Sequence, residues 1–287
     1  MPEAEGHSVR KVLAQARERL ETAGVETAAL DGRVLLAQAM NCTQTWFYTN
    51  PDAVLSADDL ARFDAMLARR EMRVPVSHIL GAREFWSRPF IVSPDVLTPR
   101  PDSETLIEAV LDHVSDRTSP LQILDLGTGS GCLLLTLLSE IPGARGTGVD
   151  VSPAALQIAA RNAEQLYCDD RVRWVEGEWE IELSDVFDIV ISNPPYIATG
   201  DLAGLEPEVV TFEPGLALDG GADGLDAYRR ILACVGAKMS EDGTVFLEIG
   251  SGQEATVTEI AREAGLARQD VRHDLSGTAR VLIFASL

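Results

Sequence analysis

The fold class of this chain is indicated most clearly by one segment, Leu121-Gln122-Ile123-Leu124-Asp125-Leu126-Gly127-Thr128-Gly129-Ser130-Gly131. Residues 121–126 are mostly apolar and have the length of a buried strand, and residues 132–138 continue as an apolar helix. The alternate glycines between them allow positive φ and let the backbone approach a ligand closely. A strand, a glycine loop and a helix in this order predict an α/β fold with a ligand at the loop.

An acidic residue follows the next predicted strand. Residues 146–149 form that strand, and Asp150 comes nineteen residues after Gly131, where an acid usually accepts hydrogen bonds from ribose hydroxyls. A dinucleotide-binding fold is the obvious rival. Its fingerprint requires a third glycine where this chain has Cys132. The spacing of the glycines resembles instead the S-adenosylmethionine loop of class I methyltransferases.

The motif Asn193-Pro194-Pro195-Tyr196 carries the chemistry. It follows an apolar run at residues 187–192 that is typical of a buried parallel strand, and ligands bind at the carboxyl ends of such strands. The prolines stiffen the turn and remove two backbone donors. The side-chain oxygen of Asn193 and the carbonyl of Pro194 are then two acceptors beside the flat ring of Tyr196. This arrangement suits the NH2 group of an amide or of an exocyclic amine.

An amide nitrogen is a poor nucleophile because its lone pair is delocalised into the carbonyl. Accepting both N–H hydrogens fixes the rotation of the group and points the lone pair at an electrophile. In the most favourable systems, positioning of this kind lowers a barrier by roughly 7–11 kcal/mol. No strong base is required, since the proton becomes acidic once the nitrogen is alkylated.

Motifs along nearly the whole chain resemble the protein-(glutamine-N5) methyltransferases that modify class-1 peptide-chain release factors. The segments that carry this resemblance are Pro75–Gly81, Arg83–Trp86, Thr98–Glu104, Asn193–Ile197, Phe212–Pro214 with Ala217 and Leu218, Gly221–Leu225 and Leu247–Gly250. DNA-adenine and RNA-guanine methyltransferases share the Asn-Pro-Pro-Tyr motif but lack the linker and the Arg100-Pro101 segment. The chain departs from the family at Val210-Thr211, where a basic residue is common, and at Glu178, where Asp is more common.

The resemblance implies a Rossmann-like, seven-stranded class I methyltransferase sheet that binds S-adenosylmethionine. By resemblance, the methionine end lies against Gly127, Thr128, Gly129, Ser130 and Gly131, the ribose on Asp150, the adenine on Glu178 and Trp179, and Asn193 beside both cofactor and substrate. The substrate amide is expected between Asn193 and Pro194, with Pro195 and Tyr196 packing beside it.

The implied substrate is the glutamine in the Gly-Gly-Gln tip of a release factor. A glutamine of a ribosomal protein is one alternative, because close relatives share these motifs. A nucleic-acid amine and a binding module without turnover are two others. The intact Asn193 argues against the binding module, which has no need of it.

Two domains joined by a linker are predicted. Helical spacing occurs within residues 8–24, 27–40 and 57–72. We expect a helical substrate-docking domain at 1–75, a linker with a β-hairpin at 76–100, and the methyltransferase domain at 101–287. A last antiparallel hairpin, around 269–273 and 280–284, is expected to close the sheet edge.

The charge distribution bears on the partner. The chain has 24 Lys plus Arg and 45 Asp plus Glu, a net charge of −21, and residues 101–287 hold 32 of the acids but only 12 basic residues. Residues 197–226, after the Asn-Pro-Pro-Tyr motif, contain seven acids and no Lys or Arg. Phosphate is held largely by Lys and Arg. We therefore expect a protein amide as substrate and no direct nucleic-acid partner.

The remaining features bear on the compartment. The sequence has no apolar run of eighteen residues and therefore predicts no membrane span. Residues 1–6 lack the layout of a signal peptide, and Cys42, Cys132, Cys168 and Cys234 have neither metal nor disulfide spacing. We expect a cytoplasmic monomer without a metal site.

Overall fold

A computed structural model describes residues 7–287 of the chain. The expectation of no signal peptide rests on residues 1–6, and these lie outside the described part. The chain divides into two compact units. The first reaches to Gly81 and includes Glu206–Phe212, and the second comprises Ala82–Leu205 with Glu213–Leu287. Within the described residues, no helix has both the length and the apolar character needed to cross a membrane.

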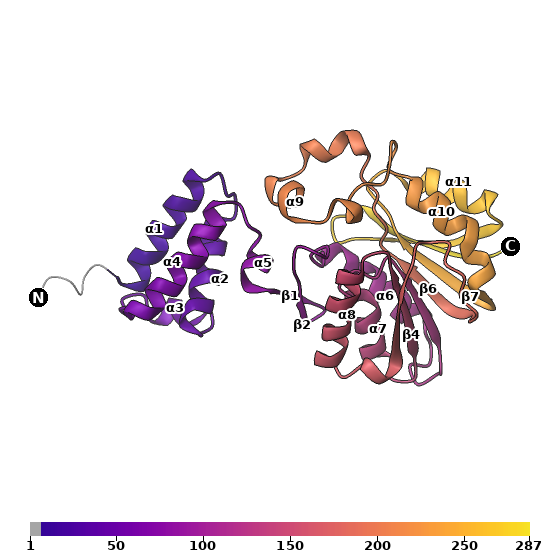
Figure 1. Cartoon of the computed structure of the whole chain (residues 1–287), viewed down its shortest axis with the longest axis horizontal. Helices are drawn as coiled ribbons and strands as arrows, with labels where there is room; N and C mark the ends of the chain where they lie inside the picture. Colours follow the sequence, from indigo (N-terminus) through magenta and orange to yellow (C-terminus); the bar gives the residue numbers. More distant parts are fainter. Residues whose placement is uncertain (1–6) are drawn as a thin grey trace, which may run out of the picture. The chain divides into compact units, whose positions relative to one another are not determined.

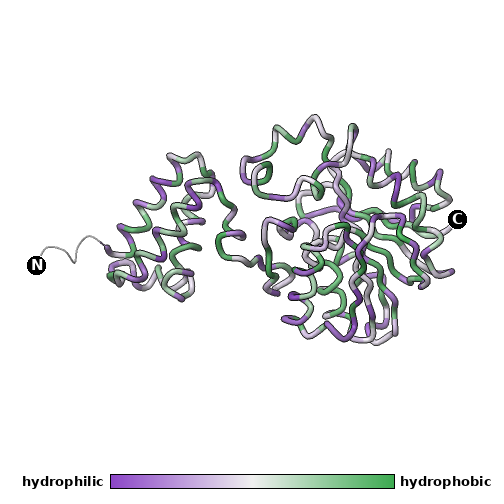
Figure 2. Tube along the Cα trace, in the orientation of Figure 1, coloured by the Kyte–Doolittle hydropathy of each residue, from purple (hydrophilic) through white to green (hydrophobic). Residues whose placement is uncertain are grey.

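The first unit is helical. Its elements are α1 (Val9–Thr22), α2 (Ala28–Met40), α3 (Trp46–Thr49), α4 (Ala57–Glu71), α5 (Val76–Leu80) and the later helix α9 (Pro207–Phe212). The long helices alternate between hydrophilic and hydrophobic residues along their turns (Figure 2). Their apolar faces meet in one core, in which Leu20, Leu35 and Phe63 are buried. The helical spacing in the sequence therefore marks the buried face of each helix.

A buried ion cluster explains why α9 belongs to this unit. Arg70 of α4 is only 5% exposed; its Nε donates to Asp31 of α2 at 2.8 Å and its Nη1 lies 2.7 Å from Glu208 of α9. Arg73 donates to the other carboxylate oxygen of Glu208 at 2.5 Å. The two arginines share two carboxylates, so each buried charge has a partner.

The second unit contains a seven-stranded sheet in the order β5-β4-β3-β6-β7-β9-β8. The strands are β3 (Gln122–Leu126), β4 (Arg145–Asp150), β5 (Val172–Glu176), β6 (Phe187–Ser192), β7 (Met239–Glu248), β8 (Leu266–His273) and β9 (Ala279–Ser286). The strands from β5 to β7 in this order are parallel, whereas β9 runs antiparallel to β7 and β8. The predicted seven-stranded sheet is confirmed, and so is the antiparallel hairpin at its edge.

Helices cover both faces of this sheet (Figure 1). One face packs against α6 (Glu104–His113), α7 (Cys132–Glu140) and α8 (Pro153–Gln165), and the other against α10 (Asp226–Val235) and α11 (Glu254–Glu263). A short hairpin, β1 (Ala82–Phe85) and β2 (Arg88–Ile91), precedes the sheet and turns at Trp86 and Ser87, both with positive φ. Because the central strands are parallel, their carboxyl ends share one edge, where ligands bind in such folds.

Candidate functional site

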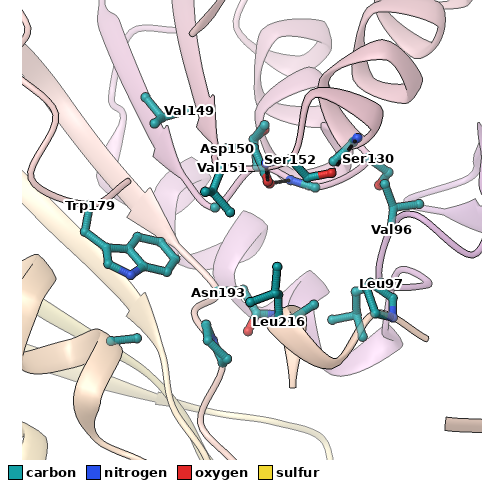
Figure 3. A pocket seen from close by; sticks show the side chains of 18 of the residues that line it. Val96, Leu97, Ser130, Val149, Asp150, Val151, Ser152, Trp179, Asn193 and Leu216 are labelled. Atoms are coloured by element: carbon teal, nitrogen blue, oxygen red, sulfur yellow. Dashed lines mark hydrogen bonds between the residues drawn. The ribbon is translucent and has the colours of Figure 1, made fainter. Parts of the chain in front are cut away.

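A cavity of about 460 Å³ lies at the carboxyl ends of the parallel strands. Trp179 and Leu97 lie on opposite sides of it, and Asp150 lies above Asn193 in this view (Figure 3). Predicted site residues that line it are Gly127, Thr128, Gly129, Ser130, Asp150, Glu178, Trp179, Asn193 and Pro195. The sheet therefore brings together residues that are far apart in the sequence.

Three predicted residues do not line this cavity. Gly131 is the N-cap of α7, with a φ of 77°. A Cβ there would lie 3.1 Å from Leu135 and from Trp174, so the small size of Gly131 serves packing. Pro194 is buried. Tyr196 is half-buried and packs against the core on the side of α10 and α11.

Asp150 shapes the glycine loop. One of its carboxylate oxygens accepts a hydrogen bond from the backbone N–H of Gly129 at 2.8 Å, and the other accepts from the N–H of Ser152 at 2.9 Å. Gly129 has a φ of 55° and open space where a Cβ would stand, whereas a Cβ on Gly127 would lie 2.9 Å from the Trp179 ring. The loop is therefore an open backbone cradle at the N-terminus of a helix, which suits an anionic or polar ligand.

Glu178 has a partner that the sequence did not reveal. It is exposed and forms an ion pair with Arg230 of α10, which also contacts Glu180 and lines the cavity. The hydrogen bonds that Arg230 donates to Glu180 and Glu178 raise the pKa of its guanidinium group, so Arg230 stays positively charged. Because Arg230 lies 52 residues further along the chain, no local pattern links it to Glu178.

The Asn193 side chain is held by its amino group. Its Nδ2 donates to the Ser103 hydroxyl at 3.1 Å, and Ser103 is itself 3% exposed. This bond leaves the side-chain carbonyl oxygen as the end that accepts a hydrogen bond from a ligand. Ser103 and Arg100 also line the cavity, although no individual role was predicted for either residue.

The remaining titratable groups near the loop do not form a nucleophile or a metal centre. Burial raises the pKa of the Cys132 thiol to about 12, so it stays protonated. Asp125 is 1% exposed, and burial raises its pKa to about 7, although it accepts a hydrogen bond from the Thr128 hydroxyl at 2.6 Å. Among residues 7–287, no group of three His, Cys, Asp or Glu side chains is placed to hold a metal ion.

The acidic segment 197–226 exposes fewer free charges than its sequence suggests. Glu208 and Glu213 are buried, Glu208 in the ion cluster of the first unit and Glu213 against Arg100, with 2.6 Å between their atoms. Asp223 and Asp226 are exposed and pair with Arg229. Of the seven acids counted in this segment, only five are therefore exposed: Asp201, Glu206, Asp219, Asp223 and Asp226.

Comparison with known proteins gives two family matches and many relatives. Residues 11–81 match the model described as PrmC N-terminal domain, and residues 101–205 match Methyltransferase small domain. A release factor glutamine methyltransferase of Rhodospirillum rubrum is 42% identical over 276 residues, covering 95% of this chain and 83% of that protein. The protein of the same name from Cereibacter sphaeroides is 44% identical over 271 residues, covering 94% and 95%.

Solved structures give the fold. The catalytic domain of hMettl16, solved with a MAT2A 3'UTR hairpin, superposes with a TM-score of 0.58 over 77% of this chain and 81% of that one. The two are 19% identical, so the likeness concerns the fold. It agrees with the predicted class I methyltransferase sheet.

Proposed function

The chain belongs to the release factor glutamine methyltransferase family, and from this premise we propose that it methylates the side-chain nitrogen of a glutamine in a class-1 release factor, with S-adenosylmethionine as methyl donor. The observation that carries the proposal is the near full-length similarity to relatives of that name. The geometry supports it through Asn193, which keeps an amide oxygen available at the end of β6. The glutamine of a Gly-Gly-Gln tip is the proposed target.

The cavity fits the cofactor. The open backbone at Gly127 and Gly129 suits the methionine end, Asp150 suits the ribose hydroxyls, and the Trp179 ring supplies an apolar face for adenine. Glu178 would reach the adenine amine while it stays paired with Arg230. When bound, S-adenosylmethionine supplies an electrophilic methyl group.

The chain contributes to the reaction by orientation. Asn193 Oδ1, which lines the cavity, would accept one hydrogen of the substrate amide and fix its plane. The carbonyl of Pro194 is proposed for the second hydrogen, although Pro194 is buried and does not itself line the cavity. Leu97 and Leu216 supply apolar cavity wall, which excludes water from the amide. The amide nitrogen loses its proton to solvent after it is alkylated, so no side chain has to act as a strong base. Tyr196 would support this turn from behind rather than stack in the cavity.

Asp150→Ala is expected to weaken S-adenosylmethionine binding by roughly 10- to 100-fold, since hydrogen bonds to a charged group contribute about 1.5–3 kcal/mol. Part of the loss comes from the backbone N–H groups of Gly129 and Ser152, which lose their acceptor. Isothermal titration calorimetry measures the dissociation constant. Asp150→Asn keeps the side-chain volume and one acceptor oxygen, so its affinity for S-adenosylmethionine should lie between those of the wild type and Asp150→Ala. An unchanged constant in Asp150→Ala would contradict the assigned role.

The substrate is tested with labelled cofactor, purified class-1 release factors and mass mapping of the modified residue. We expect one methyl group on the Gly-Gly-Gln glutamine and none on a release factor in which that glutamine is changed to Ala. Ribosomal proteins offered in the same assay test the alternative protein substrate. Methylation of a ribosomal glutamine, with the release factors untouched, would replace the proposed substrate.

Duplex DNA and tRNA are expected to bind hardly measurably at moderate salt, because segment 197–226 exposes five acids and contains no Lys or Arg. Two of these acids, Asp223 and Asp226, share a single arginine, Arg229. Non-specific nucleic-acid binders usually reach about 10⁻⁴–10⁻⁶ M. Fluorescence anisotropy with a basic nucleic-acid-binding protein as positive control measures this. Tight RNA binding with a steep salt slope would overturn the choice of a protein substrate.

The proposal extends to the first unit and to the cellular setting. Its helices would dock the release factor, because no group in them suggests catalysis. A substrate of this kind implies a cytoplasmic enzyme, and we propose that it acts as a monomer without direct nucleic-acid contact. Docking by the first unit rests on the PrmC N-terminal domain match at residues 11–81.

A further inference from the structure

A buried carboxyl group lies directly behind Asn193. Glu248 is the last residue of β7, and β7 runs parallel to β6 with Leu247 opposite Ser192. Asn193 directly follows Ser192 at the end of β6, and Glu248 directly follows Leu247 in β7, so the two residues come next after this pair. Side chains at matching positions of parallel neighbours point to the same face of a sheet. Glu248 is 2% exposed, so its carboxyl group is enclosed on that face.

Hydrogen bonds connect this carboxyl group with the amide of Asn193. Asn193 Nδ2 donates to the Ser103 hydroxyl at 3.1 Å. Side-chain hydrogen bonding with Ser103 and Asn193 acts to lower the pKa of the Glu248 carboxyl group, which places that group within reach of both. Its Oε2 is buried and has no partner. A buried carboxyl oxygen without a partner costs free energy, so stability alone does not account for an acid here.

Several charged and titratable groups surround Glu248, and they belong to different helices and strands. Arg280 of β9 favours its charged form, and Asp102, in the short helix Pro101–Ser103, disfavours it. Tyr196 and Cys132 lie near it, and Tyr228 of α10 donates its hydroxyl to the main-chain oxygen of Glu248 at 3.0 Å. Burial outweighs the attractions and raises the pKa of Glu248 to about 7.

We propose that Glu248 is a positioning residue for the methyl transfer: its carboxylate accepts hydrogen bonds from the Asn193 amino group and the Ser103 hydroxyl, which holds the Asn193 carbonyl oxygen toward the substrate amide. A negative charge at the amino end of Asn193 polarises that side chain and makes its oxygen a stronger acceptor. Hydrogen-bond chains in a low-dielectric interior strengthen one another in this way. The substrate nitrogen becomes positive as it is alkylated, so the stronger acceptor favours the transition state.

Protonation reverses this effect. A neutral Glu248 donates a hydrogen bond and competes for the Asn193 oxygen instead of holding the amino group. The contribution is therefore present above pH 7 and is lost as the pH falls through the pKa of Glu248, about 7. The inference rests on the proposed function, because it describes how that site is oriented.

The test is single-turnover methylation of a release factor by wild type and by Glu248→Gln across pH 6–9. Glu248→Gln keeps the volume but not the charge. We expect the methylation rate at pH 8 to fall by about 10- to 100-fold, less than the 10²–10³-fold typical of removing a group that contacts the transition state directly, because Glu248 acts through Asn193. The dissociation constant for S-adenosylmethionine should change less than threefold. The wild-type rate should fall toward low pH, whereas the Glu248→Gln rate should be flat in that range.

Two further variants separate positioning from structural damage. Ser103→Ala removes the bridging hydroxyl and should lower the rate by several-fold while retaining the fall toward low pH. Asp188→Asn is the matched control: Asp188 is also a strand carboxyl, held by the Gln122 N–H and the Ser240 hydroxyl at the opposite end of β6. It should keep both the rate and the pH profile.

The outcomes distinguish the inference from the function on which it rests. A wild-type protein that binds S-adenosylmethionine but leaves every release factor unmodified would end the proposed function. A wild type that methylates, with Glu248→Gln showing the same rate and the same pH profile, would overturn the role of Glu248 and leave the function intact. If Glu248→Gln did not fold, a methylation rate in Ser103→Ala equal to that of the wild type would also overturn the positioning role of Glu248.

Discussion

Asn193→Ala should lower the turnover of release factor methylation by about 10²- to 10³-fold, as removal of one preorganised polar contact to a transition state typically does. The substitution removes the side-chain oxygen that would accept one amide hydrogen, so the substrate nitrogen is free to rotate away from the methyl donor. Asn193 lines the cavity at the end of β6, whereas the glycine loop and Asp150 are untouched by the change. Cofactor affinity should therefore change less than threefold.

Steady-state kinetics with release factor, together with calorimetry of the cofactor, separate these two effects. Thr199→Ala is the matched control, since Thr199 follows in the same loop, bonds to Asp219 at 2.7 Å and does not line the cavity. It should keep near-normal turnover. Near-normal turnover in Asn193→Ala would mean that the amide is oriented by other groups, and the mechanism would have to be abandoned.

The parts of the fold that depend on local pattern could be predicted. The strand, glycine loop and helix at residues 121–138 combine an apolar run with glycines that adopt positive φ, and these signals lie within about twenty residues of each other. The C-terminal hairpin was predictable for the same reason, because β8 and β9 are neighbours in sequence. The short helices α3, α5 and α9 were not predicted, since four to six residues are too few to show a helical period.

The residues of the candidate site likewise include some that local sequence predicts and others that it does not. Residues that follow a strand were identified because every parallel strand presents its carboxyl end to the same edge. The partners that hold them come from distant segments: Ser103 is 90 residues from Asn193, and Arg230 is 52 residues from Glu178. No local spacing relates such pairs, so only the fold reveals them. Their roles toward cofactor and substrate stay predictions until the variants are measured.

The acidic segment shows why charge counted along a sequence can mislead. Glu208 and Glu213 belong to a run of seven acids without Lys or Arg, yet both are buried against arginines from elsewhere in the chain. Arg73 lies 135 residues from Glu208. The sequence thus overstated the exposed negative charge, although five acids of the segment remain at the surface.

Arg70→Met should destabilise the first unit by about 3–5 kcal/mol, the usual cost of removing one partner from a buried ion pair. Asp31 would keep its hydrogen bond from Thr27 but lose its arginine, and Glu208 would keep only Arg73. Methionine fills much of the volume of Arg70, so the loss reports uncompensated charge rather than a cavity. Hydrogen exchange of the α2 and α4 amides measures the change in this unit alone.

The controls for Arg70→Met identify charge as the cause. Arg17→Met breaks the ion pair between Arg17 and Glu21, whose side chains are 61% and 52% exposed. Losing such an exposed pair should lower the free energy of unfolding by at most about 0.5 kcal/mol. Adding Asp31→Asn to Arg70→Met removes a buried charge that has lost its ion-pair partner. The double variant should therefore be more stable than Arg70→Met itself. Since Glu208 is the residue of α9 that the two arginines hold, faster exchange should extend to Pro207–Phe212. If Arg70→Met behaved like Arg17→Met, this cluster would not be what holds α9 to the helical unit.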